Sequence, residues 1–354
     1  MKNKKVLIAM SGGVDSSVAA YLLKKEGYNL TGVFFDLGQI NCQASLKSAE
    51  KTAKKIGIPL KKINLRNQFK KMVINKFLSE FKKGNTPNPC VVCNKKIKFE
   101  NLLSLANKMK INYIATGHYT KPHKGLTFVK LLLAKDKTKD QSYFLYNLNQ
   151  KILSRTIFPL GNLIKEQVKK MADNWKLPYL KKESQDICFL KGDHNNYLRK
   201  NLKKIKLGKI VDSHSKIYGT HCGLPFYTIG QRIDLGGLPI PYYIVAKNRK
   251  RNLLIIASLV EEKKYWKKEV KIKNVNWISG KAPNLDIKCP SGHLMSKLLK
   301  ARIRYRQPLE NCKLKIENSK NYFVTFNKPQ RAVTSGQSLV IYKGQELIGG
   351  GIII

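Results

Sequence analysis

Residues 6–17 decide the fold of this chain, and they read VLIAMSGGVDSS. The apolar run 6–10 predicts a buried strand, and the stretch from Ser16 to Glu26 predicts an amphipathic helix. The two glycines between them let the backbone approach a polyanion, and the free N–H groups at the helix start point toward it. This order of strand, glycine turn and helix predicts a phosphate-binding loop. No lysine follows the glycines as in a Walker loop, and the plainer alternative is a turn in which Ser16 caps the helix.

Strand and helix signals alternate outward from this loop as far as residue 118. We expect strands at 30–35, 61–65 and 113–116 and helices at 44–56, 68–81 and 94–109. Residues 83–93 are rich in Gly, Pro and Asn, so we expect a loop there. Such alternation predicts a doubly wound parallel sheet with its ligand at the carboxyl ends of the strands. The glycine loop and the segment TGHY at 116–119 both follow such ends, so we expect them to share one crevice.

The sequence changes character near Leu202. Short strand signals at 242–245 and 253–256 alternate with turn signals, and a further series of strands begins near residue 270. Lys343-Gly344 predicts a hairpin turn within that series. The fold class is therefore α/β, and we expect three domains: a nucleotide-binding and catalytic domain at 1–201, a small central domain at 202–269 and an antiparallel β-barrel at 270–354.

Composition narrows the class of protein. A chain of 354 residues with 42% apolar content can build genuine cores, and none of its apolar runs is long enough for a membrane span. The start resembles a signal peptide, but its apolar part is short and runs into the glycine loop without a cleavage site, so we expect a cytoplasmic protein. Seven cysteines, an odd number, favour catalysis or metal binding over a disulfide framework.

The net charge of +46 favours a polyanionic partner, since lysine and arginine neutralise backbone phosphates. Only 10 of the 68 basic residues are arginine, however, and asparagine and isoleucine are abundant. An AT-rich genome would give this composition without selection for binding. Charge alone therefore leaves nucleic-acid binding and a solvated lysine surface both open.

The segment TPNPCVVCN at 86–94 is the second informative stretch. Its prolines are expected to hold the cysteines in extended geometry ahead of a helix. Cys93 would then lie near the helix start among several lysines, where the helix dipole and the cations both lower a thiol pKa and favour the thiolate. A further cysteine, Cys188, lies in ESQDICF at 183–189. A zinc half-site is the alternative for the CxxC, but no second pair follows at finger spacing.

The motifs of this chain together resemble those of a known family. SGGVDSS resembles the PP-loop of ATP pyrophosphatases, and the chain is similar to the tRNA-specific 2-thiouridylases over nearly its whole length. The similarity rests on blocks that occur in the order of that family: SGGVDSS, TPNPCVVCNKKIKF, IATGHY, KDQSYFLY, FPLG, ESQDICF, GQR, RYRQ and the late GGG. The resemblance implies a PP-loop domain of the adenine nucleotide α-hydrolase type, a central domain and a β-barrel.

The resemblance also implies a reaction. ATP with Mg²⁺ would adenylate the C2 oxygen of the wobble uridine in tRNAs for Lys, Glu and Gln. Cys188 would carry a persulfide from a cysteine desulfurase or a sulfur-relay protein and pass sulfur to C2, and Cys93 would then form a disulfide with Cys188. Cys90 stands where several family members have an aspartate proposed as acid or base. The alternative is a [4Fe–4S] cluster held by Cys90, Cys93 and Cys188.

The remaining site residues follow from the family motifs. The resemblance assigns ATP binding to Ala9, Met10, Ser11, Gly12, Gly13, Val14, Asp15, Ser16, Phe35 and Gly117. It assigns contacts with the flipped target base or the rest of the tRNA to Asn88, Pro89, Cys90, His118, Lys139, Asp140, Gln141, Arg304, Tyr305 and Gln337. Independently of the family, Arg302, Arg304 and Arg306 alternate on an expected strand, where they would face phosphate or stack on a base.

Two other functions stay open from the residues alone. One is a different PP-loop ligase or amidotransferase, which needs neither the two separated cysteines nor an arginine-bearing barrel. The other is a non-catalytic RNA-binding protein with a vestigial nucleotide fold, against which the intact glycine loop and both cysteines argue.

Overall fold

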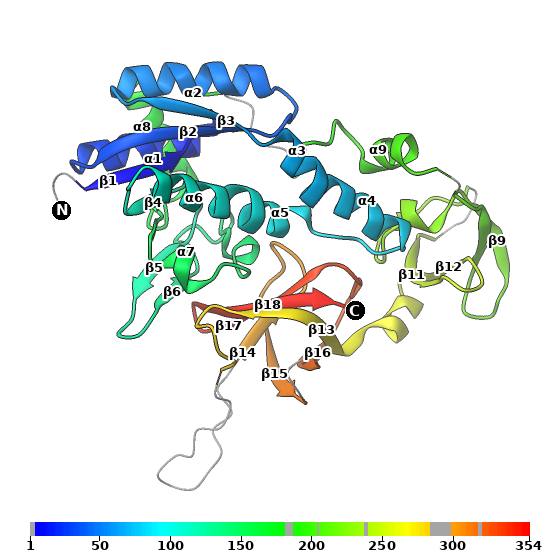
Figure 1. Cartoon of the computed structure of the whole chain (residues 1–354). Coiled ribbons are helices and arrows are strands. Elements are labelled where there is room, and N and C mark those ends of the chain that lie inside the picture. Colours follow the sequence, from blue (N-terminus) through cyan, green and yellow to red (C-terminus); the bar gives the residue numbers. More distant parts are fainter. Residues whose placement is uncertain (1–3, 181–186, 204, 237–239, 284–298, 318–320) are drawn as a thin grey trace, which may run out of the picture.

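The computed structural model describes residues 4–180, 187–203, 205–236, 240–283, 299–317 and 321–354. Within these ranges the chain forms three sheets, and each lies mainly in one of the three parts of the sequence that we expected to be a domain. Figure 1 shows the parallel sheet with its helices at the upper left, the central sheet at the far right and the barrel below them. The boundaries after residues 201 and 269 remain predictions. In the described part of the chain, no helix combines the length and apolarity that crossing a bilayer requires.

The amino-terminal sheet is parallel throughout, as the alternating pattern predicted. Its strands are hydrogen-bonded in the order β3-β2-β1-β4-β7. Their bounds are β1 Lys5–Ala9, β2 Asn29–Asp36, β3 Leu60–Asn64, β4 Tyr113–Ala115 and β7 Thr156–Ile157. The strand order reverses between β1 and β4, and in open parallel sheets a ligand binds at such a point.

Helices cover both faces of this sheet, which makes it doubly wound. One core cluster joins the sheet to α1 (Val14–Lys25), α2 (Cys42–Ile56) and α8 (Lys165–Asn174). A second cluster on the other face includes α6 (Glu100–Lys108). The strand β1 is buried between the two, with Val6, Leu7 and Ile8 all 0% exposed, as a central strand covered on both faces requires.

Two composite helices extend from this domain toward the rest of the molecule. The first runs through α3 (Arg66–Phe69), the π-helical η1 (Lys70–Ile74) and α4 (Asn75–Lys82). The second runs through α5 (Pro89–Val92), the π-helical η2 (Cys93–Phe99) and α6.

The second composite helix corrects the predicted loop over 83–93. Cys90 and Cys93 lie inside a helix and not in an extended segment ahead of one. The helix begins at Pro89 because proline suits the first helical position, and the Asn88 side chain accepts a hydrogen bond from the backbone N–H of Cys90.

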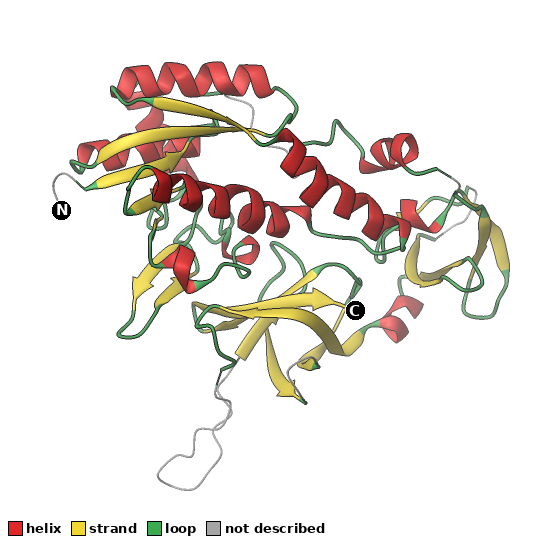
Figure 2. Cartoon of the chain, in the orientation of Figure 1, coloured by secondary structure: helices red, strands yellow, loops and turns green. Residues whose placement is uncertain are grey.

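The rest of the chain is mainly β-structure (Figure 2). After α9 (His194–Asn201) the central sheet has the order β10-β11-β12-β8-β9. Its strands are β8 Gly208–Val211, β9 Ile217–His221, β10 Arg232–Ile233, β11 Tyr242–Asn248 and β12 Leu253–Ser258. The short helix η5 (Glu261–Tyr265) leads from this sheet into the barrel.

The carboxyl-terminal strands close into an antiparallel barrel, as predicted. β13 pairs with both β16 and β18 and so joins the two ends of the order β13-β16-β15-β14-β17-β18. The bounds are β13 Lys267–Trp277, β14 Leu299–Arg302, β15 Glu310–Ile316, β16 Tyr322–Gln330, β17 Ser338–Lys343 and β18 Glu346–Ile353. The predicted turn after Lys343 is present, with Gly344 at φ +57°.

The barrel is joined to the first domain by strand pairing. A hairpin of β5 (Lys121–Lys124) and β6 (Val129–Leu132) leaves the first domain, and β6 pairs with β18. An ion pair between Lys130 and Glu346, at 3.0 Å, lies at the same junction. The two domains therefore share one continuous sheet.

Candidate active site

The glycine loop is held in a single conformation by its neighbours. Gly12 has φ +79°, and a Cβ there would lie 2.2 Å from the Ser45 carbonyl oxygen, so no other residue fits. The Ser16 hydroxyl accepts from the backbone N–H of Ser11 at 3.1 Å and donates to the Gly13 carbonyl at 3.0 Å. Ala9 and Met10 lead into this loop from β1, and Val14 to Ser16 form the first turn of α1. The loop is a tightly packed, hydrogen-bonded turn in front of a helix start.

The end of β4 lies against this loop, as the shared crevice predicted. A Cβ on Gly117 would lie 2.9 Å from the backbone of Asp15, so only glycine permits this approach. The Tyr119 hydroxyl donates to the Asp15 carboxylate at 2.7 Å. Phe35 lies at the end of the neighbouring strand β2 and is buried.

Lys165 completes the loop, and the sequence reasoning missed it. Its ammonium group lies 2.6 and 2.7 Å from the two carboxylate oxygens of Asp15, and its side chain is 13% exposed. It stands at the start of α8, whereas the Walker pattern places its lysine directly after the glycines. The motif FPLG shortly before it was the available signal.

The fold brings the segment of Cys188 to that of Cys93, because Phe189 packs against the core cluster that contains Cys93. Cys90 and Cys188 raise the pKa of the Cys93 thiol, and the Lys98 ammonium group lowers the pKa of both Cys93 and Cys188. The Cys188 carbonyl accepts a hydrogen bond from the backbone N–H of Ile40 at 3.3 Å, which ties its loop to the segment after β2. Residues separated by 95 positions in the sequence therefore meet beside the parallel sheet.

The predicted low pKa of Cys93 is wrong. Burial raises the pKa of its thiol to about 12, and the opposing effect of Lys98 is smaller. The helix starts at Pro89, so Cys93 lies one turn inside it and is 6% exposed. Cys188 is an exposed residue, but protein atoms crowd its thiol and this desolvation raises its pKa as well. Both groups are protonated thiols at neutral pH.

The loop before these cysteines is held by the barrel. The backbone N–H of Thr86 donates to the Ser335 carbonyl at 2.9 Å, and the Gln337 amide donates to the Thr86 carbonyl at 2.9 Å. Gln337 therefore reaches the loop that contains Asn88, Pro89 and Cys90. Throughout the described ranges, no three His, Cys, Asp or Glu side chains are grouped so as to hold a metal ion.

Comparison with known proteins gives the same three parts. Residues 4–192 match the tRNA methyl transferase HUP domain, residues 195–258 its PRC-barrel domain and residues 267–353 the aminomethyltransferase β-barrel domain. The tRNA-specific 2-thiouridylase MnmA of Francisella tularensis subsp. holarctica is 38% identical over 370 residues, which cover 100% of both chains. MnmA 2 of Clostridium botulinum is 41% identical over 360 residues, 98% of each chain.

The chain belongs to the tRNA-specific 2-thiouridylase family. Among solved structures, a 4-thiouridine synthetase–RNA complex with bound ATP is 18% identical, with a TM-score of 0.35 over 49% of this chain and 40% of that one.

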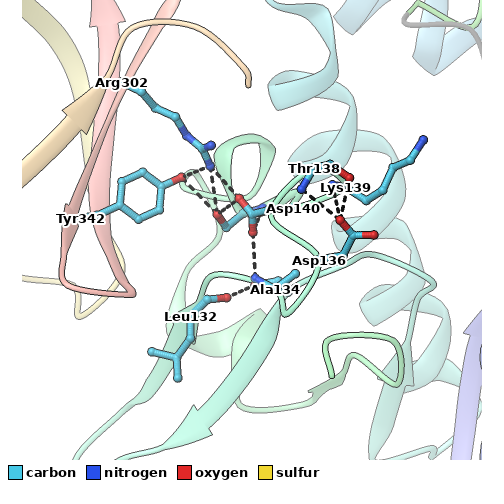
Figure 3. Close-up of polar contacts among 10 residues, drawn as sticks. Leu132, Ala134, Asp136, Thr138, Lys139, Asp140, Arg302 and Tyr342 are labelled. Carbon is cyan, nitrogen blue, oxygen red and sulfur yellow. Dashed lines mark hydrogen bonds and ion pairs between the residues drawn. The ribbon is translucent and has the colours of Figure 1, made fainter. Parts of the chain in front are cut away.

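The segments that the family resemblance assigned to tRNA lie where the domains meet. Asp140 is 2% exposed, and its carboxylate binds the Arg302 guanidinium at 2.6 Å. The Tyr342 hydroxyl accepts from the same guanidinium at 2.7 Å (Figure 3). Lys139 extends away from this ion pair in Figure 3, and its backbone N–H donates to Asp136. Whether these residues contact tRNA remains a prediction.

The predicted row of three arginines on one strand is wrong. The strand β14 ends at Arg302, which points inward to Asp140, and Arg306 follows in a turn with φ +65°. Arg304 donates to the carbonyls of Ile229 and Ala332, both at 2.9 Å, and so joins the central domain to the barrel. Alternation fails because the chain turns directly after β14.

Three other predicted residues have internal partners. Burial lowers the pKa of His118 to about 3, and its Nδ1 lies 2.9 Å from the Thr116 hydroxyl, so the ring is neutral at pH 7. Gln141 accepts from the backbone N–H of Tyr119 at 2.9 Å. The ring of Tyr305 packs on that of Phe144 with 4.5 Å between centroids.

Proposed function

We propose that this chain is a tRNA-uridine 2-sulfurtransferase, which uses ATP to place sulfur at C2 of the wobble uridine. One observation supports this most strongly: a hydrogen-bonded phosphate-type loop lies on the same parallel sheet as the core cluster that contains Cys93, and Phe189, next to Cys188, packs against that cluster. The relatives named tRNA-specific 2-thiouridylase, alike over the full length, support the same reaction.

The first step is activation of a poor leaving group. The uridine C2 oxygen attacks the α-phosphorus of ATP, pyrophosphate leaves, and the oxygen becomes part of an AMP ester. The loop from Ser11 to Ser16 would hold the phosphates through its backbone N–H groups. Lys165 would supply the cation that the loop itself lacks, because Asp15 holds its ammonium group at the loop. Mg²⁺ would accompany the ATP.

The second step delivers sulfur. The terminal sulfur of a Cys188 persulfide attacks C2, AMP leaves, and a disulfide now links Cys188 to the base. The Cys93 thiol attacks the Cys188 sulfur, the S–S bond to the base breaks, and a Cys93–Cys188 disulfide forms. The thiol proton passes to the departing base, which leaves as 2-thiouridine. An external thiol reductant then restores both cysteines. Cys93 is buried, which protects its thiol until this step.

A rival route uses the third thiol. It is the [4Fe–4S] cluster on Cys90, Cys93 and Cys188 that the family resemblance left open, although the described residues hold no group of side chains arranged as a metal site. Iron content and the absorbance near 400 nm of anaerobically purified protein separate the two routes. Colourless, active protein supports the persulfide, whereas about four irons per chain support the cluster.

The decisive experiment compares Cys188→Ala with Cys222→Ala, since Cys222 is a free cysteine of the central domain. Each variant is given ATP, unmodified tRNA and a persulfide donor, and pyrophosphate and 2-thiouridine are measured. We expect Cys188→Ala to release pyrophosphate without forming 2-thiouridine, and Cys222→Ala to do both. Thiolation by Cys188→Ala would contradict the persulfide route. Pyrophosphate release without tRNA would indicate a small-molecule ligase, and no release at all an RNA-binding module.

A further inference from the structure

Asp136 connects two segments that the proposed reaction uses for different ligands. One oxygen of its carboxylate accepts the backbone N–H groups of Thr138 and Lys139, at 3.0 and 3.2 Å (Figure 3). These residues lead into the stretch 139–141, which the family resemblance assigns to tRNA and which we call the tRNA segment. The other carboxylate oxygen accepts the backbone N–H of Lys165 at 2.9 Å. One side chain thus holds the tRNA segment and the start of α8 together.

The start of α8 depends on this carboxylate. Lys165 is the first residue of the helix, where a backbone N–H has no partner within the helix. Ile164 stands at the N-cap and has no side-chain oxygen to accept that N–H. A negative charge at a helix start is also favourable. Burial opposes ionisation of Asp136, but its hydrogen bonds outweigh burial and lower its pKa, so the group is a carboxylate at neutral pH.

From Lys165 the contacts continue to the glycine loop. Its ammonium group lies 2.6 and 2.7 Å from the two carboxylate oxygens of Asp15. The position of this ammonium group follows from where α8 begins, and Asp136 sets that point. Hydrogen bonds therefore run from the tRNA segment through Asp136 and Lys165 to the loop expected to hold ATP.

A second set of contacts joins the same two places. Gln141 and Tyr119 bind each other twice: the Tyr119 N–H donates to the Gln141 side chain, and the Gln141 N–H donates to the Tyr119 carbonyl, both at 2.9 Å. The Tyr119 hydroxyl donates to Asp15 at 2.7 Å, and the Lys165 ammonium group lies 5.8 Å from the centre of the Tyr119 ring. Both sets of contacts end at the Asp15 carboxylate, so the tRNA segment is fixed relative to the glycine loop.

We propose that Asp136 is a positioning residue that couples tRNA binding at residues 139–141 to the placement of Lys165 at the ATP loop. The inference rests on the proposed function, because it takes tRNA and ATP to be the two ligands. Bound tRNA fixes the tRNA segment, Asp136 transmits this to the start of α8, and the Lys165 ammonium group is held where it meets the phosphates. ATP then binds more tightly in the presence of tRNA, and by reciprocity tRNA binds more tightly in the presence of ATP.

The test compares Asp136→Asn with a matched control, Asp173→Asn. Asp173 is an exposed residue near the other end of α8, and its carboxylate accepts the Tyr179 hydroxyl at 2.9 Å. Each change removes one carboxylate that contacts α8 or its end, but the link to the tRNA segment belongs to Asp136. An asparagine there keeps the shape and turns an NH₂ group toward one of the two segments.

The probe is α,β-methylene-ATP, which cannot be cleaved between its α and β phosphates. Its Kd is measured by calorimetry with and without saturating unmodified tRNA, and the ratio of the two values is the coupling factor. The thermal midpoint is recorded for each variant. A protein that is merely less stable has fewer folded molecules but keeps the ratio, so the coupling factor separates positioning from loss of structure.

We expect a coupling factor of about five or more in the unaltered chain and in Asp173→Asn, and below about two in Asp136→Asn. Adding Asp136→Asn to Lys165→Met should change the factor no further, since both act through one ammonium group. Equal factors in the two aspartate variants overturn the inference, as does a factor near one in an unaltered chain that binds both ligands. An unaltered chain that binds no ATP analogue or does not thiolate tRNA would instead overturn the proposed function.

Discussion

At the scale of single residues, Lys165 gives the sharpest prediction. Lys165→Met removes the cation at the glycine loop, so pyrophosphate release in the presence of tRNA should fall about 10²-fold or more, as when one preorganised electrostatic group is removed. Lys170→Met, on the exposed side of the same helix, should change it little. Measuring pyrophosphate at saturating tRNA tests this, with circular dichroism to verify folding. Equal rates of pyrophosphate release in the two variants would show that Lys165 does not act at the nucleotide site.

The buried thiol of Cys93 gives a prediction about pH. Because its pKa is raised to about 12, the thiolate fraction grows tenfold per pH unit between pH 7 and pH 10. Alkylation of Cys93 by iodoacetamide, followed by peptide mass spectrometry, should rise over this range without a plateau. A plateau near pH 7 would show an activated thiolate and contradict the burial argument.

The same shift fixes the sign of a stability effect. The pKa in the folded chain lies above the ordinary value of 9.0, so the folded state holds this proton more tightly than the unfolded state. The stabilisation is complete below about pH 9 and is lost as pH rises toward 12. Cys93→Ala should therefore make the unfolding free energy less dependent on pH in that range.

At the scale of elements, the turn between β1 and α1 has no room for a side chain at Gly12. Gly12→Ala places a methyl group 2.2 Å from the Ser45 carbonyl and strains a backbone with φ +79°. Gly57, which follows α2, has a similar φ of +71°, but a Cβ there would meet no atom within 4 Å. Gly57→Ala is therefore a control that introduces the backbone strain of about 1–2 kcal/mol without a steric clash. We expect Gly12→Ala to lose both ATP-dependent pyrophosphate release and several degrees more of thermal midpoint than Gly57→Ala. Equal midpoints and intact release would contradict the tight loop.

The elements also show how far sequence reasoning reaches. The strands β1, β2, β3 and β4 were predicted to within one or two residues, because apolar runs bounded by glycine or polar residues report burial directly. The start of α5 was missed, since Pro89 suits either an extended loop or a first helical turn and the Asn88 cap decides between them. The local sequence pattern therefore predicts the bounds of the strands better than the start of the helix that carries the cysteines.

The candidate site was harder to predict than the fold, for a related reason. Motifs identified the glycine loop and both cysteines, but Lys165 reaches the glycine loop through a contact between distant segments. Arg302 likewise looked like a nucleic-acid contact until the fold placed Asp140 against it. Charge pattern along a strand carries no information about which face is covered by another domain.

At the scale of the whole molecule, the Asp140–Arg302 pair is predicted to hold the barrel on the first domain. Both partners are buried, at 2% and 7% side-chain exposure. Removing one charge leaves the other buried and unpaired, which costs about 3–5 kcal/mol. The pair Lys130–Glu346 joins the same two domains but is 36% and 19% exposed, so losing it should cost less than about 1 kcal/mol. Asp140→Asn should therefore lower the urea midpoint of the full chain far more than Glu346→Gln, and equal midpoints would show that strand pairing between β6 and β18 alone joins the domains.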